Sequence, residues 1–282
     1  MAVASGASGG ATGGGATGGG ATVVVKLGGE VVGGAKMAEL ARDLRALVDA
    51  GSRVVVTHGG GPQATALSKK LGLEPRMVGG RRVTDAPTLD VMKMVIAGQV
   101  NVDLCAQLRA AGLRPVGLHD IVRAHKRPPR VVSGGGAEPI DFGHVGDVDD
   151  FDLQLLTSVL DGGWLPVVAC LGHGSDGAVY NINADIVANQ LAGALKADAL
   201  VLVTGAPGVL RDINDAASRI PRLTIDEGKR AIADGVVSGG MIPKLEESFA
   251  ALSLGARAIY IVSGDLARAV REPGSVGTVL VP

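Results

Sequence analysis

Two lysines lie near opposite ends of the chain, and each is close to a pair of glycines. Lys26 ends an apolar run and is followed by Gly28 and Gly29, and Lys244 follows the stretch 238–243, Ser-Gly-Gly-Met-Ile-Pro. A migrating phosphoryl group spreads negative charge over several oxygens, and fixed positive charges beside free backbone N–H groups stabilise it. Each lysine alone is equally compatible with an ordinary surface charge. The phosphoryl-transfer hypothesis therefore depends on whether folding brings the two lysines together.

A second group of glycines follows the next apolar run. Gly59, Gly60 and Gly61 lie between Val-Val-Val-Thr-His and the start of a helical pattern. Glycines allow the backbone to approach a ligand closely, and free N–H groups at a helix start favour an anion. The alternative is a simple strand-to-helix turn, which does not need three consecutive glycines. No Gly-x4-Gly-Lys-Ser/Thr sequence occurs in the chain, which excludes a P-loop kinase.

Three polar residues elsewhere are further candidates for a site. Asp185 comes just before an apolar helical pattern, together with Asn181. Its carboxylate can cap that helix, or it can hold two lysines by accepting hydrogen bonds from both, and spacing alone does not decide. Arg82 precedes a long helical pattern, where it can clamp a substrate carboxylate or belong to a solvated basic pair with Arg81.

The elements that must position these residues alternate along the chain. Short β-branched runs alternate with amphipathic helical segments, which predicts parallel strands joined by crossover helices. The predicted strands are 22–27, 53–57, 114–118, 165–170, 199–204 and 258–262, and the predicted helices include 37–50, 62–71 and 88–111, the last with a break at Gly98. Near-continuous apolar strands are typical of a sheet covered on both faces. We therefore expect an α/β fold, a three-layer αβα sandwich with a mainly parallel central sheet.

Other segments are less regular. Residues 119–148 are expected to form loops or short antiparallel strands, and the basic, proline-rich part around residues 126–130 is expected to be a solvated loop. Residues 1–21 are rich in Gly, Ala and Thr and are expected to be a disordered extension. The rest is expected to form two lobes, 22–192 and 193–282.

Composition excludes several classes of protein. The 282 residues carry a net charge of -1, which argues against a nucleic-acid partner, and no apolar run is long enough to cross a membrane. Cys105 and Cys170 lack a C-x-x-C partner and are expected to be buried thiols in a cytoplasmic protein. The five histidines and the acidic stretch 146–152 lack the spacing of a metal site, so no protein-bound metal is expected.

Taken together, these motifs resemble the amino acid kinase family, over residues 22–282. The stretches that carry the resemblance follow one another along the chain: Val-Lys-Leu-Gly-Gly at 25–29, Thr-His-Gly-Gly-Gly-Pro at 57–62, Gly-Arg-Arg-Val-Thr-Asp at 80–85, Asp-Phe-Gly-His-Val-Gly-Asp-Val at 141–148, Tyr-Asn-Ile-Asn-Ala-Asp at 180–185 and Gly-Gly-Met-Ile-Pro-Lys at 239–244. Several such motifs in order are specific, although no single one is.

The resemblance implies an activity and a role for each candidate residue. The reaction would be ATP-dependent phosphorylation of the γ-carboxylate of N-acetyl-L-glutamate in arginine biosynthesis, with Mg²⁺ carried by the ATP phosphates. Lys26 and Lys244 would stabilise the moving phosphoryl group, and Asp185 would orient both. The other roles would be phosphate binding by Gly28, Gly29 and Gly59, and substrate binding by Gly60, Gly61, Arg82 and Asn181. The first lobe would bind the acidic substrate and form a homodimer, and the second would bind ATP.

The chain also departs from the family pattern. After Leu118 the family usually has a Ser/Thr-Gly and an Asp-Gly turn, whereas this chain has His-Asp-Ile at 119–121. A related kinase that acts on carrier-linked aminoadipate or glutamate therefore stays an alternative, as does a non-catalytic amino-acid sensor. Gly205 stands where the family often has an Asp that contacts the nucleotide. The glycine-rich N-terminus replaces the helix that builds hexamers in some members, so a homodimer is the expected assembly.

Overall fold

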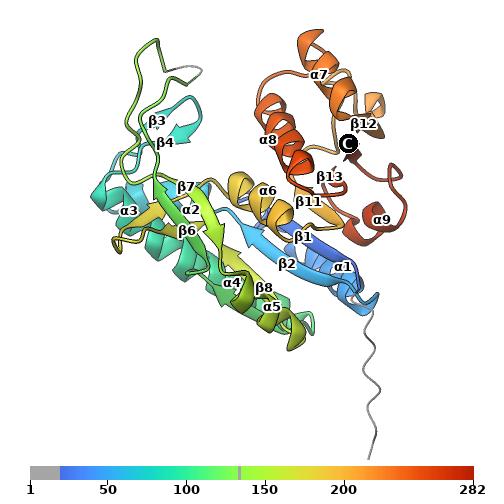
Figure 1. The fold of residues 1–282 in the computed structure, drawn as a ribbon, viewed down its shortest axis with the longest axis horizontal. Helices are drawn as coiled ribbons and strands as arrows, with labels where there is room; N and C mark the ends of the chain where they lie inside the picture. Colours follow the sequence, from blue (N-terminus) through green and yellow to red (C-terminus); the bar gives the residue numbers. More distant parts are fainter. Residues whose placement is uncertain (1–19, 133–134) are drawn as a thin grey trace, which may run out of the picture.

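A large, mostly parallel sheet forms the centre of the computed structural model, which describes residues 20–132 and 135–282 (Figure 1). The disordered extension was expected over residues 1–21, of which 1–19 lie outside the described residues. The strand order is β12-β14-β13-β11-β1-β2-β8-β5. Their bounds are β1 Thr22–Leu27, β2 Arg53–His58, β5 Pro115–Leu118, β8 Leu165–Ala169, β11 Ala199–Val203, β12 Arg222–Thr224, β13 Ile259–Val262 and β14 Thr278–Val281. Every strand predicted from the sequence is present, to within about one residue at each end.

Helices cover both faces of this sheet, which confirms the expected three-layer α/β fold. Helix α1 contacts both α4 and α9, whereas α6 packs over β1, β2 and β11 and contacts α8 (Figure 1). Their bounds are α1 Met37–Asp49, α2 Gly61–Lys70, α3 Ala86–Lys93, α4 Asn101–Ala110, α5 Leu153–Asp161, α6 Ala184–Ala194, α7 Ile225–Ala233, α8 Met241–Ser253 and α9 Leu266–Arg271. None of the helices in the described ranges is both long and apolar enough to span a membrane.

The predicted long helix 88–111 is continuous but not uniform. Between α3 and α4 the backbone forms a π-helical segment, η1 (Met94–Val100), which contains Gly98. The break expected at Gly98 is therefore a local widening of the helix. Such π-helical segments are frequent at functional sites, and here Val95, Ile96 and Val100 of η1 face the second glycine turn.

A smaller sheet lies beside the central one. The irregular region 119–148 contributes β6 (Val122–Lys126) and β7 (Gly146–Phe151), which pair antiparallel, as expected. Strands β9 (Leu171–His173) and β10 (Val179–Asn181) complete the order β10-β9-β6-β7. A two-stranded hairpin, β3 (Met77–Val78) and β4 (Arg81–Arg82), projects nearby (Figure 1). These short strands bring Asn181 and Arg82 toward the carboxyl edge of the central sheet.

Candidate active site

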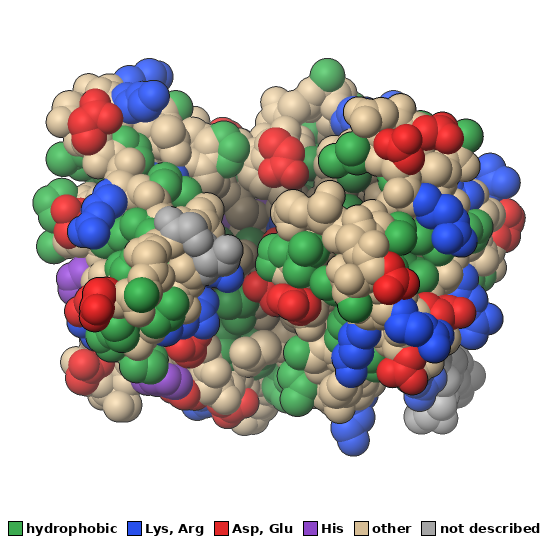
Figure 2. All heavy atoms as spheres, turned by 90° about the horizontal axis from the view of Figure 1, so that it is seen from above, with side chains coloured by type: hydrophobic (Ala, Val, Ile, Leu, Met, Phe, Trp, Pro, Cys, Tyr) green, Lys and Arg blue, Asp and Glu red, His purple; other side chains and the backbone are tan. Residues whose placement is uncertain are grey.

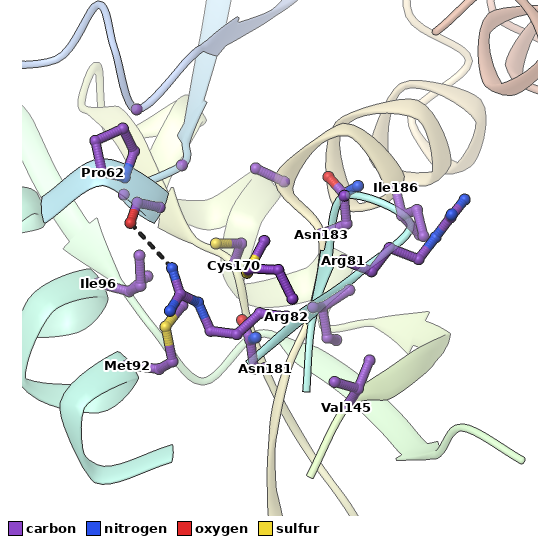
Figure 3. Close-up of a pocket in the computed structure, with 18 of the residues that line it drawn as sticks. Pro62, Arg81, Arg82, Met92, Ile96, Val145, Cys170, Asn181, Asn183 and Ile186 are labelled. Carbon is purple, nitrogen blue, oxygen red and sulfur yellow. Dashed lines mark hydrogen bonds between the residues drawn. The ribbon is translucent and has the colours of Figure 1, made fainter. Parts of the chain in front are cut away.

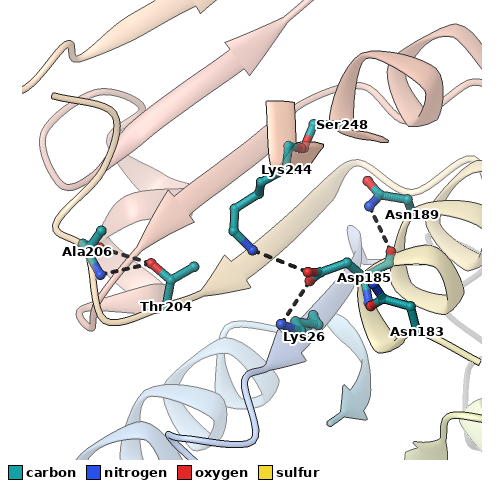
Figure 4. Close-up of polar contacts among 8 residues, drawn as sticks. All are labelled: Lys26, Asn183, Asp185, Asn189, Thr204, Ala206, Lys244 and Ser248. Carbon is teal, nitrogen blue, oxygen red and sulfur yellow. Dashed lines mark hydrogen bonds and ion pairs between the residues drawn. The ribbon is translucent and has the colours of Figure 1, made fainter. Parts of the chain in front are cut away.

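The structure brings the two distant lysines together on one carboxylate. Lys26 lies near the carboxyl end of β1, and its Nζ is 2.8 Å from Asp185 Oδ1. Lys244 lies in the first turn of α8, and its Nζ is 3.3 Å from Asp185 Oδ2 (Figure 4). The side chains are only 9%, 16% and 20% exposed for Lys26, Lys244 and Asp185. The carboxyl ends of central parallel strands are where α/β proteins bind ligands, so the cluster lies where a ligand is expected.

Asp185 is free to bridge the lysines because another residue caps its helix. Asn183 is the N-cap of α6, and its side chain accepts a hydrogen bond of 2.8 Å from the backbone N–H of Asp185. Helix α6 begins at Ala184, so Asp185 stands in its first turn, where the helix dipole also favours a negative charge. Of the two readings that the sequence left open for Asp185, the bridge between lysines is the one observed.

The carboxylate of Asp185 is ionised at neutral pH. Burial alone would raise the pKa of Asp185, but the ammonium groups of Lys26 and Lys244 outweigh burial and hold the pKa below the usual 3.8. Asp185 therefore keeps the ammonium groups of Lys26 and Lys244 close together. Without it, the two ammonium groups would repel each other.

The two glycine turns lie against each other at the ends of β1 and β2, which pair in parallel. A Cβ atom added to Gly29 would lie 3.0 Å from the backbone nitrogen of Gly60 and 3.1 Å from that of Gly61. Helix α2 begins at Gly61, so these N–H groups belong to a helix N-terminus and favour an anion. Gln63 Nε2 donates to Gly29 O at 2.8 Å and so fixes the first turn relative to the second.

A buried histidine supports the second turn. His58 is fully buried, and burial lowers its pKa to about 4 despite the opposing effect of its hydrogen bond to Gly59. Asn101 Nδ2 is a donor 3.0 Å from His58 Nε2, so Nε2 must accept and Nδ1 carries the proton, which it donates to Gly59 O at 3.1 Å. The other hydrogen of Asn101 Nδ2 goes to Val167 O at 3.0 Å. Asn101 was not identified from the sequence, because it lies inside an unremarkable helical pattern.

A cavity of about 280 Å³ opens between the glycine turns and the smaller sheet. It is lined by Lys26, Gly29, Gly59, Gly60, Gly61, Arg82, Asn181 and apolar side chains such as those labelled in Figure 3. Seen from above, the molecule is hollowed between its two halves (Figure 2). Both glycine turns and three of the side chains predicted from the sequence, Lys26, Arg82 and Asn181, therefore meet around one space, whereas Gly28, Asp185 and Lys244 are not among the residues that line it.

Arg82, which lines this cavity, has one donor without a partner. Its Nη2 donates to Gly61 O at 3.1 Å (Figure 3) and to Thr65 Oγ1 at 2.7 Å. Its Nη1 is buried and has no hydrogen-bond partner in the part of the chain that the structure describes. Burial lowers the pKa of Arg82, yet a guanidinium stays protonated in proteins. An anionic group in the cavity would supply the missing acceptor. Asn181 is held beside it by its hydrogen bond of 3.1 Å to Thr84 Oγ1.

Arg127, which lines the cavity together with Arg81 and Arg82, was not identified from the sequence. The basic segment around residues 126–130 was expected to be solvated, which is wrong for Arg127: its side chain is 4% exposed and lines the cavity. Asp147 forms an ion pair with it at 2.6 Å. Strands β6 and β7 place the two residues close together, and this pairing was not readable from the basic segment alone.

The other end of the site is built by the C-terminal half. Thr204 follows β11, and its Oγ1 accepts a hydrogen bond of 3.0 Å from the backbone of Ala206, which shapes the loop that contains Gly205 (Figure 4). Gly239 has φ of +58°, a left-handed conformation that favours glycine, just before α8. Among the described residues, no three His, Cys, Asp or Glu side chains are grouped as a metal site would need.

Comparison with known proteins agrees with this geometry. Residues 21–263 match the amino acid kinase family. The chain is 60% identical over 268 residues to the acetylglutamate kinase of Anaeromyxobacter sp. (strain Fw109-5), covering 92% of this chain and 99% of that protein. It is 43% identical over 244 residues to the acetylglutamate kinase of Methanopyrus kandleri, covering 85% and 94%.

Solved structures share the fold. A protein of Streptococcus mutans UA159 superposes with a TM-score of 0.76 at 26% identity, covering 92% of this chain and 98% of that one. Carbamate kinase from Giardia lamblia bound to AMP-PNP superposes with a TM-score of 0.66 at 19% identity, covering 93% and 98%. At that level the second likeness concerns the fold alone. On its family match and its close relatives, this chain belongs to the amino acid kinase family.

Proposed function

We propose that the protein transfers the γ-phosphoryl group of ATP to the γ-carboxylate of N-acetyl-L-glutamate, giving an acyl phosphate and ADP, as a step of arginine biosynthesis. Relatives at 60% identity over nearly their whole length bear the name acetylglutamate kinase. The single observation that carries the proposal is the pair of lysines bridged by Asp185 beside a cradle of backbone N–H groups. Phosphoryl transfer depends mainly on positioning and on charge stabilisation, and this arrangement supplies both.

Each end of the acceptor has a matching group in the cavity. The free Nη1 of Arg82 is suited to the α-carboxylate, because arginine binds carboxylates with directed hydrogen bonds. Asn181 lines the same space. The γ-carboxylate would then reach the N–H groups of Gly60 and Gly61, near Lys26. Gly28, Gly29 and Gly59 would hold phosphate oxygens.

Magnesium would enter with the nucleotide. Mg²⁺ is commonly bound through substrate phosphates and one or two carboxylates. Asp185 is already engaged by both lysines, so the residues present fit a Mg²⁺ ion that rides on the ATP phosphates. When bound, the ion would neutralise part of the phosphate charge. Lys26 and Lys244 would then stabilise the charge on the transferred group itself.

The positions of these groups indicate which ligand each lobe would bind. Residues 22–192 would form the acceptor lobe, since they supply Arg82 and Asn181, and residues 193–282 the ATP lobe, since they supply Lys244. We further propose a cytoplasmic homodimer formed by the acceptor lobes. Its support is a set of exposed apolar side chains at the end of α2, in η1 and in α4: Leu71, Met94 and Val102, which are 54%, 52% and 62% exposed. A molar mass of one chain in solution would contradict the dimer.

Release of ADP with several acceptors tests the activity. N-acetyl-L-glutamate should be turned over, whereas free glutamate, aspartate and UMP should be poor substrates. No turnover of free N-acetyl-L-glutamate would overturn the proposal in favour of a carrier-linked acceptor or a sensor.

Replacing the second lysine tests the chemistry. Lys244→Met should lower kcat by about 10²- to 10³-fold with little change in KM, which is the cost of losing one group that stabilises transition-state charge. Lys229→Met, at an exposed position of α7, removes the same charge outside the site and should leave kcat unchanged. Undiminished turnover by Lys244→Met would refute the role of the lysine pair.

A further inference from the structure

Arg127 is a buried guanidinium at the wall of the acceptor cavity. It follows directly on β6, and its backbone N–H donates to Val145 O at 2.8 Å, so the backbone is fixed where the pairing of β6 with β7 ends. The side chain is 4% exposed and still lines the cavity, together with Arg82 and Asn181. A charged side chain is almost never buried to this degree unless it is paired.

Asp147 holds this guanidinium by one edge. Its Oδ1 accepts hydrogen bonds from both Nε, at 2.8 Å, and Nη2, at 2.6 Å, and Nη2 also donates to Gly146 O at 3.2 Å. In the described part of the chain, no hydrogen bond of Arg127 Nη1 is found. Two of the three guanidinium nitrogens are therefore fixed by the protein, and the third keeps its hydrogens for another acceptor.

Arg82 and Arg127 differ in charge balance; the third arginine that lines the cavity, Arg81, donates to Gly79 O at 3.3 Å. The hydrogen-bond partners found for Arg82 are neutral, Gly61 O and Thr65 Oγ1, so its positive charge is available for a carboxylate. Arg127 forms an ion pair with Asp147, so the pair carries almost no net charge. Such a pair offers a directed N–H donor without the full attraction of a free cation. It suits a neutral carbonyl oxygen, and its guanidinium still repels an ammonium group brought close to it.

We propose that Arg127, oriented by Asp147, donates through Nη1 to the carbonyl oxygen of the acceptor's N-acyl group and so selects N-acylated over free α-amino acids. This inference rests on the proposed function and deepens it. An acceptor with a free α-ammonium group lacks the carbonyl acceptor and places a positive charge beside Arg127. An N-acylated acceptor has no charge on nitrogen and satisfies the donor. A site that hydrogen-bonds one substrate group discriminates strongly against analogues that lack it.

Three ligands that differ only at the α-nitrogen isolate this contact. N-acetyl-L-glutamate carries the acetamido group, L-glutamate carries an ammonium group in its place, and glutarate carries hydrogen there, while all three keep both carboxylates. The KM of N-acetyl-L-glutamate and the inhibition constants of the other two as competitors are measured for the wild-type enzyme, Arg127→Met and Arg127→Lys. Arg123→Met is the matched control, because Arg123 lies on β6 with a 61% exposed side chain paired to Asp150.

In Arg127→Met the KM of N-acetyl-L-glutamate should rise by about 10- to 100-fold, the loss expected when a hydrogen bond to a charged group is removed. The inhibition constant of glutarate should stay within about twofold, because glutarate never makes the contact. The inhibition constant of glutamate should fall, because the Arg127 guanidinium no longer repels its ammonium group. Arg127→Lys should retain part of the wild-type preference, and Arg123→Met should change none of the constants.

Equal rises in the constants for N-acetyl-L-glutamate and glutarate would overturn the assignment, because they would place Arg127 on a carboxylate or on the fold alone. Both constants, the KM of N-acetyl-L-glutamate and the inhibition constant of glutarate, are measured on one preparation of each variant. A partly unfolded fraction therefore does not alter their ratio. If Arg127→Met does not fold, Arg127→Lys is measured instead. A ratio of the KM of N-acetyl-L-glutamate to the inhibition constant of glutarate that equals the wild-type ratio would then overturn the assignment. A wild-type enzyme that does not turn over N-acetyl-L-glutamate would instead refute the proposed function.

Discussion

Asp185→Asn is the substitution that most directly tests the site. Asparagine keeps the shape of aspartate but has one oxygen and one NH₂ group. Its oxygen can accept from either Lys26 or Lys244, and its NH₂ group then faces the other ammonium as a second donor. The structure has both carboxylate oxygens in use, at 2.8 Å and 3.3 Å, so one of the two contacts must be lost.

The cost can be estimated from these distances. With each ammonium about 3 Å from the shared carboxylate, the two nitrogens lie roughly 5 to 6 Å apart, and two unit charges at that separation repel by on the order of 3 kcal/mol at an effective dielectric constant of about 20. Breaking a buried ion pair by removing one partner typically costs about 3–5 kcal/mol. Because Asp185 is 20% exposed, we expect the lower end, about 3 kcal/mol of unfolding free energy. Displacement of both lysines should also lower kcat by about 10²- to 10³-fold.

The effect on stability should depend on pH. Despite the opposing effect of burial, the two lysines hold the folded-state pKa of Asp185 below 3.8, so the carboxylate stabilises the fold fully above its unfolded pKa. That contribution is lost as pH falls through the folded-state pKa. Urea unfolding should therefore show the full difference between wild type and Asp185→Asn at pH 7 and a smaller one below pH 4.

Asp161→Asn provides the matched control, because Asp161 pairs with Arg53 at 2.7 Å but is 64% exposed. An exposed pair of this kind contributes under about 1 kcal/mol. Asp185→Asn with wild-type kcat would refute the orienting role of Asp185. An unfolding free-energy difference that is equally large at pH 7 and pH 3.5 would refute its electrostatic origin.

Two further predictions concern the glycine turns. Gly29→Ala should abolish turnover, because its Cβ would lie 2.9 Å from Pro62 Cδ and 3.0 Å and 3.1 Å from the backbone nitrogens of Gly60 and Gly61, and so displace the turn that is proposed to bind the anion. Gly98→Ala, where a Cβ meets nothing within 4 Å, should be active. For His58, with a folded-state pKa of about 4 against 6.5 in the unfolded chain, the unfolded state binds the proton first as pH falls. The unfolding free energy should therefore decrease between pH 6.5 and pH 4, by at most about 3 kcal/mol, and less in His58→Gln; equal slopes in urea titrations would contradict this.

The main elements of the fold were predictable because their signals are local. Strands β1, β2 and β11 are short apolar runs that are buried on both faces, and β-branched composition indicates them directly. Strand β14, which lies between β12 and β13, was not predicted, because Thr278–Val281 is short and its antiparallel pairing with β13 depends on a contact between segments that only the folded chain brings together. Short strands of this kind carry little periodicity of their own.

The site was predictable only in part, for a related reason. Parallel strands present their carboxyl ends at one edge, so Lys26 and the glycine turns were expected to lie together. Whether Asp185 caps α6 or bridges the lysines depends on Asn183, which takes the cap. Arg127 lies in a segment that reads as solvated, and its burial follows from Asp147 on a neighbouring strand. Such pairings are properties of the tertiary structure.

The position of β1 has a consequence for synthesis of the protein. This first strand lies in the middle of the sheet, between β2, which follows it closely, and β11, whose segment begins just beyond Asp198, 176 positions after Thr22. On the ribosome, β1 can pair with β2 soon after it emerges, but its other edge has no β11 to pair with until most of the chain has been made. An unpaired edge of consecutive valines is a template for aggregation. The edge of β1 that will pair with β11 must therefore be kept from other chains during synthesis, before the residues of the site that Lys26 joins have been made.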